Sequence, residues 1–190
     1  MTLEQIKNSV VGSTWRSIAP EVRPSAAKNA DGSPKPFYLT RQFAVLPNDE
    51  FRLQITQLAD PYGKVPLARL LIKGNMLWRG PHPITEGAYK VDFSASIAYE
   101  VTPLAKGFAD VLNQIAKSGF DLWAVNKMQD ILKKAFPPFG LSEGQIFKEY
   151  DLICLLGDFM FWGARHVDGR GFDTEENRPT NLQIPLVREK

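Results

Sequence analysis

Alternating apolar and polar residues run along much of the chain and predict a mainly β protein. The clearest strand covers residues 89–101. Its apolar face would carry Tyr89, Val91, Phe93, Ala95, Ile97, Tyr99 and Val101, and Lys90, Asp92, Ser94, Ser96 and Glu100 would face the other way. Residues 37–46 and 50–58 alternate in the same way around Pro47–Asp49, a run of good turn formers, and predict a β-hairpin.

The remaining β segments are shorter or less regular. A first strand is expected near Thr14–Ile18, and segments 65–74 and 75–80 predict a pair of strands joined around Gly74–Asn75. Segment 23–36 is rich in Pro, Ser, Ala and Asn and predicts a long surface loop. Three further strands are expected in the C-terminal part, at 149–157, 158–165 and 180–188.

Helical periodicity appears in three places. Residues 3–10 predict a short amphipathic helix, and Pro103 suits the first turn of a helix with apolar residues at Leu104, Phe108, Val111, Leu112 and Ile115. A second pattern, from Leu122 to Phe136, stops at Pro137–Pro138. We therefore expect one calycin-like domain over residues 1–190, with an N-terminal helix within 1–12 and a helical insertion over 103–136.

The order of these elements predicts a fold class. About eight antiparallel strands with two or three accessory helices favour a mainly β, calycin-like (lipocalin-like) partial barrel. A barrel of about eight strands is just wide enough to hold one small ligand.

The composition limits the kinds of binding partner and the cellular compartment that we expect for the protein. The hydrophobic fraction of 44% and the charged fraction of 23% are ordinary for a globular protein, and a formal charge of +2 with scattered basic residues argues against nucleic-acid binding. Cys154 is the only cysteine, so an internal disulfide is excluded. The start of the chain lacks a secretion signal, and no run approaches the roughly 20 apolar residues that span a bilayer. We expect a soluble, cytoplasmic protein without stable membrane insertion.

No cofactor or metal is indicated by the motifs. His82, His166 and Cys154 lack zinc spacing, and the glycines form no phosphate-binding fingerprint. The patterns leave the oligomeric state open.

Arg41 is the most informative charge. Alternation places it on the same strand face as Phe37, Leu39, Phe43 and Val45, where a buried guanidinium needs an oxygen partner. Glu21, which lies with Arg23 between Pro20 and Pro24, and Glu86 are candidates by type. Two interpretations stay open: an internal ion pair that pins the loop to the barrel, or an arginine that faces the cavity and binds an anionic head group.

Acid–base chemistry is the alternative use of the same region. Glu21 and Glu86 could act as proton donors or acceptors if burial raises their pKa values, and His82 lies in a proline-flanked loop near Glu86. These three residues are the catalytic candidates for a small-molecule cyclase or isomerase.

A series of short motifs resembles the domain of the adenomatosis polyposis coli down-regulated family. The motifs are Trp-x-Ser, Glu-x-Arg, Leu-Thr-Arg, Asp-Pro and Thr-Glu-x-x-Tyr, and "DLICLLGD" and "NRPTNLQIPL" resemble late segments of the family. The resemblance runs from about Thr14 to Leu186. Its motif positions are Trp15, Glu21, Arg23, Leu39, Thr40, Arg41, Asp60, Thr85, Glu86 and Tyr89.

The resemblance implies a fold and a type of ligand. Animal members are extracellular, membrane-anchored Wnt inhibitors built from tandem, disulfide-bonded, lipid-binding half-barrels, so the chain would be a single-domain version with an apolar cavity for an acyl chain. Ala19–Pro20 and Gly63 stand where the animal pattern has cysteines, so the inhibitor role is not carried over. Glu21, Arg23, Arg41 and Glu86 all hold motif positions, which predicts one polar cluster at an end of the barrel.

These observations lead to one main hypothesis and two others. The main hypothesis is a binder of a hydrophobic small molecule or lipid, with Arg23 and Arg41 at its head group. The residues expected to line the cup are Phe37, Phe43, Leu53, Trp78 and Phe93. The alternatives are the cyclase or isomerase and a protein-interaction module with an exposed apolar patch over Leu104–Phe136.

Overall fold

The computed structural model describes residues 1–116 and 118–189, apart from the side chains of residues 24–27 and 34. Its α-helices are α1 (Leu3–Val10) and α2 (Lys106–Ile115), and single 3₁₀ turns lie at η1 (Pro47–Asp49) and η2 (Pro137–Phe139). The strands are β1 (Thr14–Ser17), β2 (Glu21–Lys28), β3 (Pro34–Leu46), β4 (Glu50–Leu58), β5 (Pro66–Pro81), β6 (Ala88–Pro103), β7 (Gln129–Asp130), β8 (Lys148–Leu156), β9 (Phe159–Trp162) and β10 (Leu186–Arg188).

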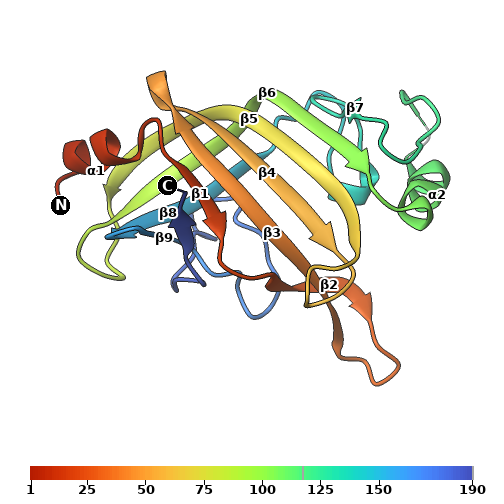
Figure 1. Ribbon diagram of the computed structural model, residues 1–190, viewed down its shortest axis with the longest axis horizontal. Coiled ribbons are helices and arrows are strands. Elements are labelled where there is room, and N and C mark those ends of the chain that lie inside the picture. Colours follow the sequence, from red (N-terminus) through yellow and green to blue (C-terminus); the bar gives the residue numbers. More distant parts are fainter. Residues whose placement is uncertain (117, 190) are drawn as a thin grey trace.

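Eight antiparallel strands close into a barrel (Figure 1). The hydrogen-bonded order is β1-β10-β9-β8-β6-β5-β4-β3, and β1 also pairs with β3, which completes the circuit. β2 adds to β3 beyond the end of β1, and β7 pairs with β6. The predicted mainly β, antiparallel, calycin-like barrel with accessory helices is confirmed, and the barrel is closed rather than partial.

The first helix forms where the sequence predicts it. Thr2 caps α1, because its side chain accepts from the main-chain N–H of Gln5 while the Gln5 side chain accepts from the N–H of Thr2. Ile6 and Val10 are fully buried in the barrel core. The helix therefore lies against the end of the barrel at which both termini are found (Figure 1).

The predicted hairpin and the long alternating strand are also confirmed. β3 and β4 join through η1, in which Asn48 has a left-handed φ of 63°. On β6 the apolar face is buried from Val91 to Ala95 and again at Tyr99 and Val101, while Ile97 is exposed. Ile97 lies where the pairing of β6 with β5 shifts register.

The same register shift overturns the predicted turn at Gly74–Asn75. Segments 65–74 and 75–80 form one continuous strand, β5, instead of a pair. Lys73 pairs with Ala98 and Asn75 pairs with Ser94, so Gly74 lies in a β-bulge opposite three residues of β6. A Cβ at Gly74 would overlap the main-chain oxygen of Ser94. Glycine is therefore needed for close approach of two strands, and it does not mark a turn.

The helical insertion is shorter than expected. α2 confirms the helix after Pro103, whereas the pattern from Leu122 to Phe136 forms turns, the two-residue strand β7 and extended chain. Asn126 and Lys133 have left-handed φ values of 62° and 58°, which an α-helix excludes.

Tertiary contacts replace the predicted second helix. Asn113 of α2 donates to the carbonyl of Trp123 at 2.9 Å and accepts from its N–H at 2.8 Å. Trp123, Ile131 and Phe136 are buried in the core. Leu122, Val125 and Met128 of the predicted helix are exposed, so its spacing does not mark one buried face, and the irregular segment packs at the α2 end of the barrel (Figure 1).

The predicted loop at 23–36 is mostly a β-hairpin. β2 and β3 form its arms, and the main-chain N–H of Asn29 donates to Ser33 in the turn between them. Figure 1 shows this hairpin extending away from the barrel.

Large aromatic side chains fill one part of the barrel interior. Phe43 packs edge-on against Trp162 at a ring-centroid distance of 4.7 Å, and Trp162 stacks on Phe93 at 5.1 Å. Trp15 of β1 is fully buried.

Neither α1 nor α2 is long and apolar enough to cross a membrane, within the residues described.

Candidate functional site

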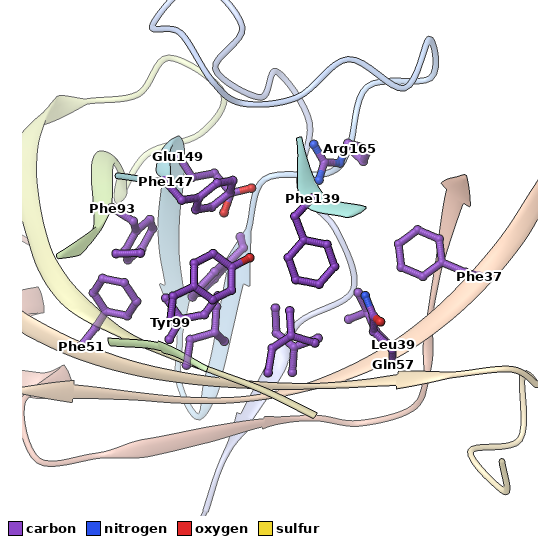
Figure 2. Close-up of a pocket in the computed structure, with 16 residues that line it drawn as sticks. Phe37, Leu39, Phe51, Gln57, Phe93, Tyr99, Phe139, Phe147, Glu149 and Arg165 are labelled. Atoms are coloured by element: carbon purple, nitrogen blue, oxygen red, sulfur yellow. The ribbon is translucent and has the colours of Figure 1, made fainter. Parts of the chain in front are cut away.

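An apolar cavity occupies the rest of the barrel interior (Figure 2). Its volume is about 190 Å³, which equals roughly six water molecules at about 30 Å³ each. Strands β3, β4, β5 and β6 supply most of the wall. The apolar lining residues are Phe37, Leu39, Phe51, Leu53, Ile55, Leu70, Ile72, Phe93, Ala95, Tyr99, Phe139, Phe147 and Trp162.

A smaller cavity of about 90 Å³ adjoins the first one. The two share Leu39, Leu53, Ile55, Glu149, Trp162 and Arg165. The smaller cavity is more polar, because Arg23, Arg41, Asp151 and Gln183 also line it. The barrel interior therefore has an apolar compartment with a charged end.

Two opposite charges face both cavities without pairing. Glu149 comes from β8 and Arg165 follows β9, and Figure 2 shows both on the same side of the main cavity. Among the described residues, neither side chain has a hydrogen bond or an ion pair within 4 Å. The Arg165 guanidinium instead lies 4.8 Å from the ring centroid of Phe172. Both groups are thus available to polar atoms of a ligand.

Glu21 is held by three partners below the smaller cavity. Its Oε1 accepts from Arg41 Nε at 2.9 Å and from the Ser17 hydroxyl at 3.0 Å, and its Oε2 accepts from Arg23 Nη2 at 2.9 Å. Glu21 and Arg41 are only 4% and 5% exposed. The ion pair that we considered for Arg41 is therefore present, and it ties β2 to β3.

Arg41 keeps unused hydrogen-bonding capacity in this arrangement. Its guanidinium lies 4.6 Å from the ring centroid of Trp162, which is cation–π geometry. Its Nη2 is buried and has no hydrogen-bond partner among the described residues, and the same holds for Trp162 Nε1. Two unpartnered donors beside the charged end favour an incoming acceptor oxygen.

Asp151 adds a second carboxyl to the inner face of β8. Its Oδ1 accepts from the main-chain N–H groups of Leu152 at 2.7 Å and Gly163 at 2.9 Å, so its orientation is fixed. Burial, and next the charge of Glu149, raise the pKa of Asp151 to about 7. The Asp151 carboxyl therefore titrates at a much higher pH than an exposed aspartate.

Burial also changes the pKa values of the neighbouring groups. It raises the pKa of Glu149, although Arg165, Arg23 and Arg41 oppose the change, and it raises that of Tyr99. Burial and the charge of Arg41 lower the pKa of Arg23. Because Glu21 pairs with Arg23 and Arg41 and Arg165 has no ion-pair partner among the described residues, this end of the cavity offers guanidinium donors to an anionic group.

The structure brings together many of the expected ligand-binding residues. Phe37, Leu53 and Phe93 line the main cavity, and Arg23 and Arg41 line the smaller one. Phe43 and Trp78 lie in the core and line neither cavity, because their neighbours fill the space around them.

The acid–base candidates lie elsewhere. Glu21 is committed to its three partners, whereas the exposed Glu86 and the half-buried His82 together line a shallow surface pocket beside Met1, Thr2 and Gln5. Burial lowers the pKa of His82. Of the predicted polar cluster, Glu21, Arg23 and Arg41 meet, and Glu86 does not join them.

The sequence analysis did not select three charged residues of the site: Glu149, Asp151 and Arg165. Alternation in β8 could have found the carboxyls, since Glu149 and Asp151 share a face with Phe147 and Ile153, as Arg41 does with its apolar neighbours. Arg165 follows a strand end and carries no such signal.

The α2 region exposes apolar side chains, which is one feature expected of a protein-interaction module. Five apolar side chains are exposed there, although the second helix is absent: Val111, Ile115, Leu122, Val125 and Met128.

Metal binding has little to support it in the described part of the chain. Residues 1–116 and 118–189 contain no group of three or more His, Cys, Asp or Glu side chains that could hold a metal ion.

Comparison with known proteins assigns the chain to no family. No protein-family model and no curated protein matches the chain. The resemblance to the adenomatosis polyposis coli down-regulated family stays a prediction.

Proposed function

We propose that the protein binds a small hydrophobic molecule, with an anionic or otherwise oxygen-rich head group, inside the barrel. The observation that carries the proposal is the apolar cavity whose charged end holds Arg165 and Glu149 without ion-pair partners among the described residues. Ligand pockets commonly combine apolar walls with a few convergent polar groups.

The head group would lie at the charged end. Arg165 reaches the cavity, and the unpartnered Nη2 of Arg41 lies beside it. An anionic oxygen would supply an acceptor for Arg41 Nη2 and for the Arg165 guanidinium. The apolar tail would then lie along Leu70, Ile72 and Ala95 in the main cavity.

The size of the cavity limits the ligand. A volume of about 190 Å³ is below the roughly 300–1,000 Å³ of pockets for drug-sized ligands, and it exceeds the roughly 150 Å³ of an apolar cavity that accepts benzene. A medium-chain acyl group or a small ring fits this range. The family resemblance, which implies an acyl ligand, agrees with this proposal.

Calorimetric titration with octanoate and octanol tests the proposal, because the two probes share a chain and differ in the charge of the head. We expect octanoate to bind at least about tenfold more tightly than octanol, which corresponds to about 1.4 kcal/mol. Arg165→Met should remove this preference and leave octanol binding unchanged. Arg170→Met, at an exposed arginine paired with Asp168, is the matched control and should behave as wild type.

Two results would overturn the proposal. One is failure of both probes to bind. The other is equal affinity for both probes in the wild type, since the charged end would then make no contact with a head group.

A further inference from the structure

Glu149 is the carboxyl group that simple binding leaves unexplained. Glu21 and Asp151 both accept hydrogen bonds from the protein, whereas the Glu149 carboxyl accepts none from the described residues and faces both cavities. A carboxylate that merely anchored the fold would be expected to have such partners.

The surroundings of Glu149 combine apolar walls with nearby cations. In the sheet it pairs with Phe93 of β6, and Tyr99, Phe147 and Trp162 line the same cavity. The charged groups facing it are Arg165 after β9, Arg23 of β2, Arg41 of β3 and Asp151 two residues along β8. An apolar substrate in the main cavity would therefore lie against a carboxyl group, with guanidinium groups at one end.

We propose that Glu149 is a proton-transfer group that isomerises a small hydrophobic carbonyl compound bound in this cavity, with Arg165 at the carbonyl oxygen. The inference rests on the proposed binding of a hydrophobic ligand and adds a reaction to it. Its substrate class is an unsaturated ketone, aldehyde or ester small enough for the cavity.

The reaction moves one proton and shifts one double bond. The Glu149 carboxylate removes a proton from the carbon beside the carbonyl, the C–H electron pair forms a C=C bond, and the carbonyl π electrons move to the oxygen. Arg165 stabilises the resulting enolate oxygen. The Glu149 carboxyl then returns the proton to the far carbon of the conjugated system, and the C=O bond re-forms. Substrate and product are isomers, so the reaction consumes no oxidant, reductant or second substrate.

The electrostatics of the cavity suit this role. Burial raises the pKa of Glu149 and so strengthens its carboxylate as a base. Asp151, which has a pKa of about 7, keeps a second proton close to Glu149 at neutral pH.

The experiment uses β,γ-cyclohexenone and follows its conversion to the conjugated α,β-isomer by ultraviolet absorbance. We expect wild-type protein to accelerate the conversion over the same buffer without protein, and Glu149→Gln to lose about a hundredfold of that acceleration. Glu176→Gln changes an exposed loop carboxylate and is the matched control. Octanoate titration of Glu149→Gln shows that the variant is folded and that its cavity is open.

The possible outcomes separate the two proposals. Acceleration that is lost in Glu149→Gln and kept in Glu176→Gln supports the inference. Binding of octanoate and cyclohexenone without acceleration, or acceleration that survives in Glu149→Gln, overturns the inference and leaves the proposed binding intact. Failure of both compounds to bind overturns both proposals.

Discussion

Arg41 shows how one side chain can join the fold to the cavity. Its Nε donates to Glu21, which fixes β2 against β3, and its remaining donor lies unpartnered beside the smaller cavity. The internal ion pair therefore uses Nε of Arg41, and Nη2 is the atom that the proposed head group would contact. The alternating pattern predicted that Arg41 faces inward. Which glutamate pairs with Arg41 depends on the register of β2 on β3, in which Glu21 lies opposite Leu39.

Removing the carboxylate of Glu21 should destabilise the protein strongly. Glu21→Gln would leave Arg41 buried and Arg23 partly buried without their anionic partner, and breaking a buried ion pair from one side typically costs about 3–5 kcal/mol. Glu86→Gln, at an exposed site, should change the free energy of unfolding by less than about 0.5 kcal/mol. Urea denaturation of the two variants makes the comparison, and equal stabilities would contradict the structural role of Glu21.

Asp151 should make the stability of the protein fall as the pH rises from about 4 to about 7. The pKa of Asp151 is about 7 in the folded protein and 3.8 for an unperturbed aspartate, so over this range the folded state holds a proton that the unfolded state releases. The loss is at most about 1.4 kcal/mol per pH unit and ends above the folded pKa. Asp151→Asn lacks this titration, and the measurement is the difference between the unfolding free energies of the variant and the wild type across this range. A difference that does not change with pH would show that Asp151 is ionised throughout.

At the scale of elements, local patterns predicted those elements whose interactions are local. Helix α1 carries its own cap in Thr2 and Gln5, and the β3–β4 hairpin carries its own turn, so both were found. The predicted turn at Gly74 and the predicted helix over 122–136 both failed, because tertiary contacts decide these segments. Main-chain crowding from Ser94 requires glycine in the middle of β5, and Asn113 of α2 holds Trp123 outside any helix.

The β-bulge explanation predicts a position-specific effect within β5. Gly74→Ala should destabilise the protein by about 2 kcal/mol or more, because the new methyl group must displace the main chain of β6. Gly80→Ala is the matched control on the same strand, since a Cβ there meets nothing within 4 Å. Thermal or urea unfolding would reveal the difference, and a Gly74→Ala variant as stable as Gly80→Ala would contradict the bulge.

At the scale of the whole molecule, barrel closure creates the candidate site. β1 bridges β3 and β10, which brings together inward-facing residues from distant parts of the chain, such as Arg23, Arg41, Glu149 and Arg165. The sequence predicted the barrel and the apolar character of its wall. It also predicted a polar cluster with Arg23 and Arg41, but it could not place Glu149, Asp151 and Arg165 beside them, because closure of the barrel brings these distant segments together.

Filling the cavity should abolish binding without loss of stability. Ala95 of β6 lines the main cavity and is 2% exposed, so Ala95→Leu would place a larger apolar side chain in the space assigned to the ligand tail. We expect octanoate binding to be lost and the midpoint of thermal unfolding to stay unchanged or rise. Ala124→Leu, at an exposed position, should bind octanoate like wild type. Unaltered octanoate binding by folded Ala95→Leu would place the ligand elsewhere.

The most direct test of the account is a crystal structure of the protein grown with octanoate. We expect electron density for one octanoate inside the barrel, with its carboxylate within hydrogen-bonding distance of the Arg165 guanidinium and its chain against Ala95 and Ile72. An interior filled by protein side chains, or octanoate bound only outside the barrel, would contradict it.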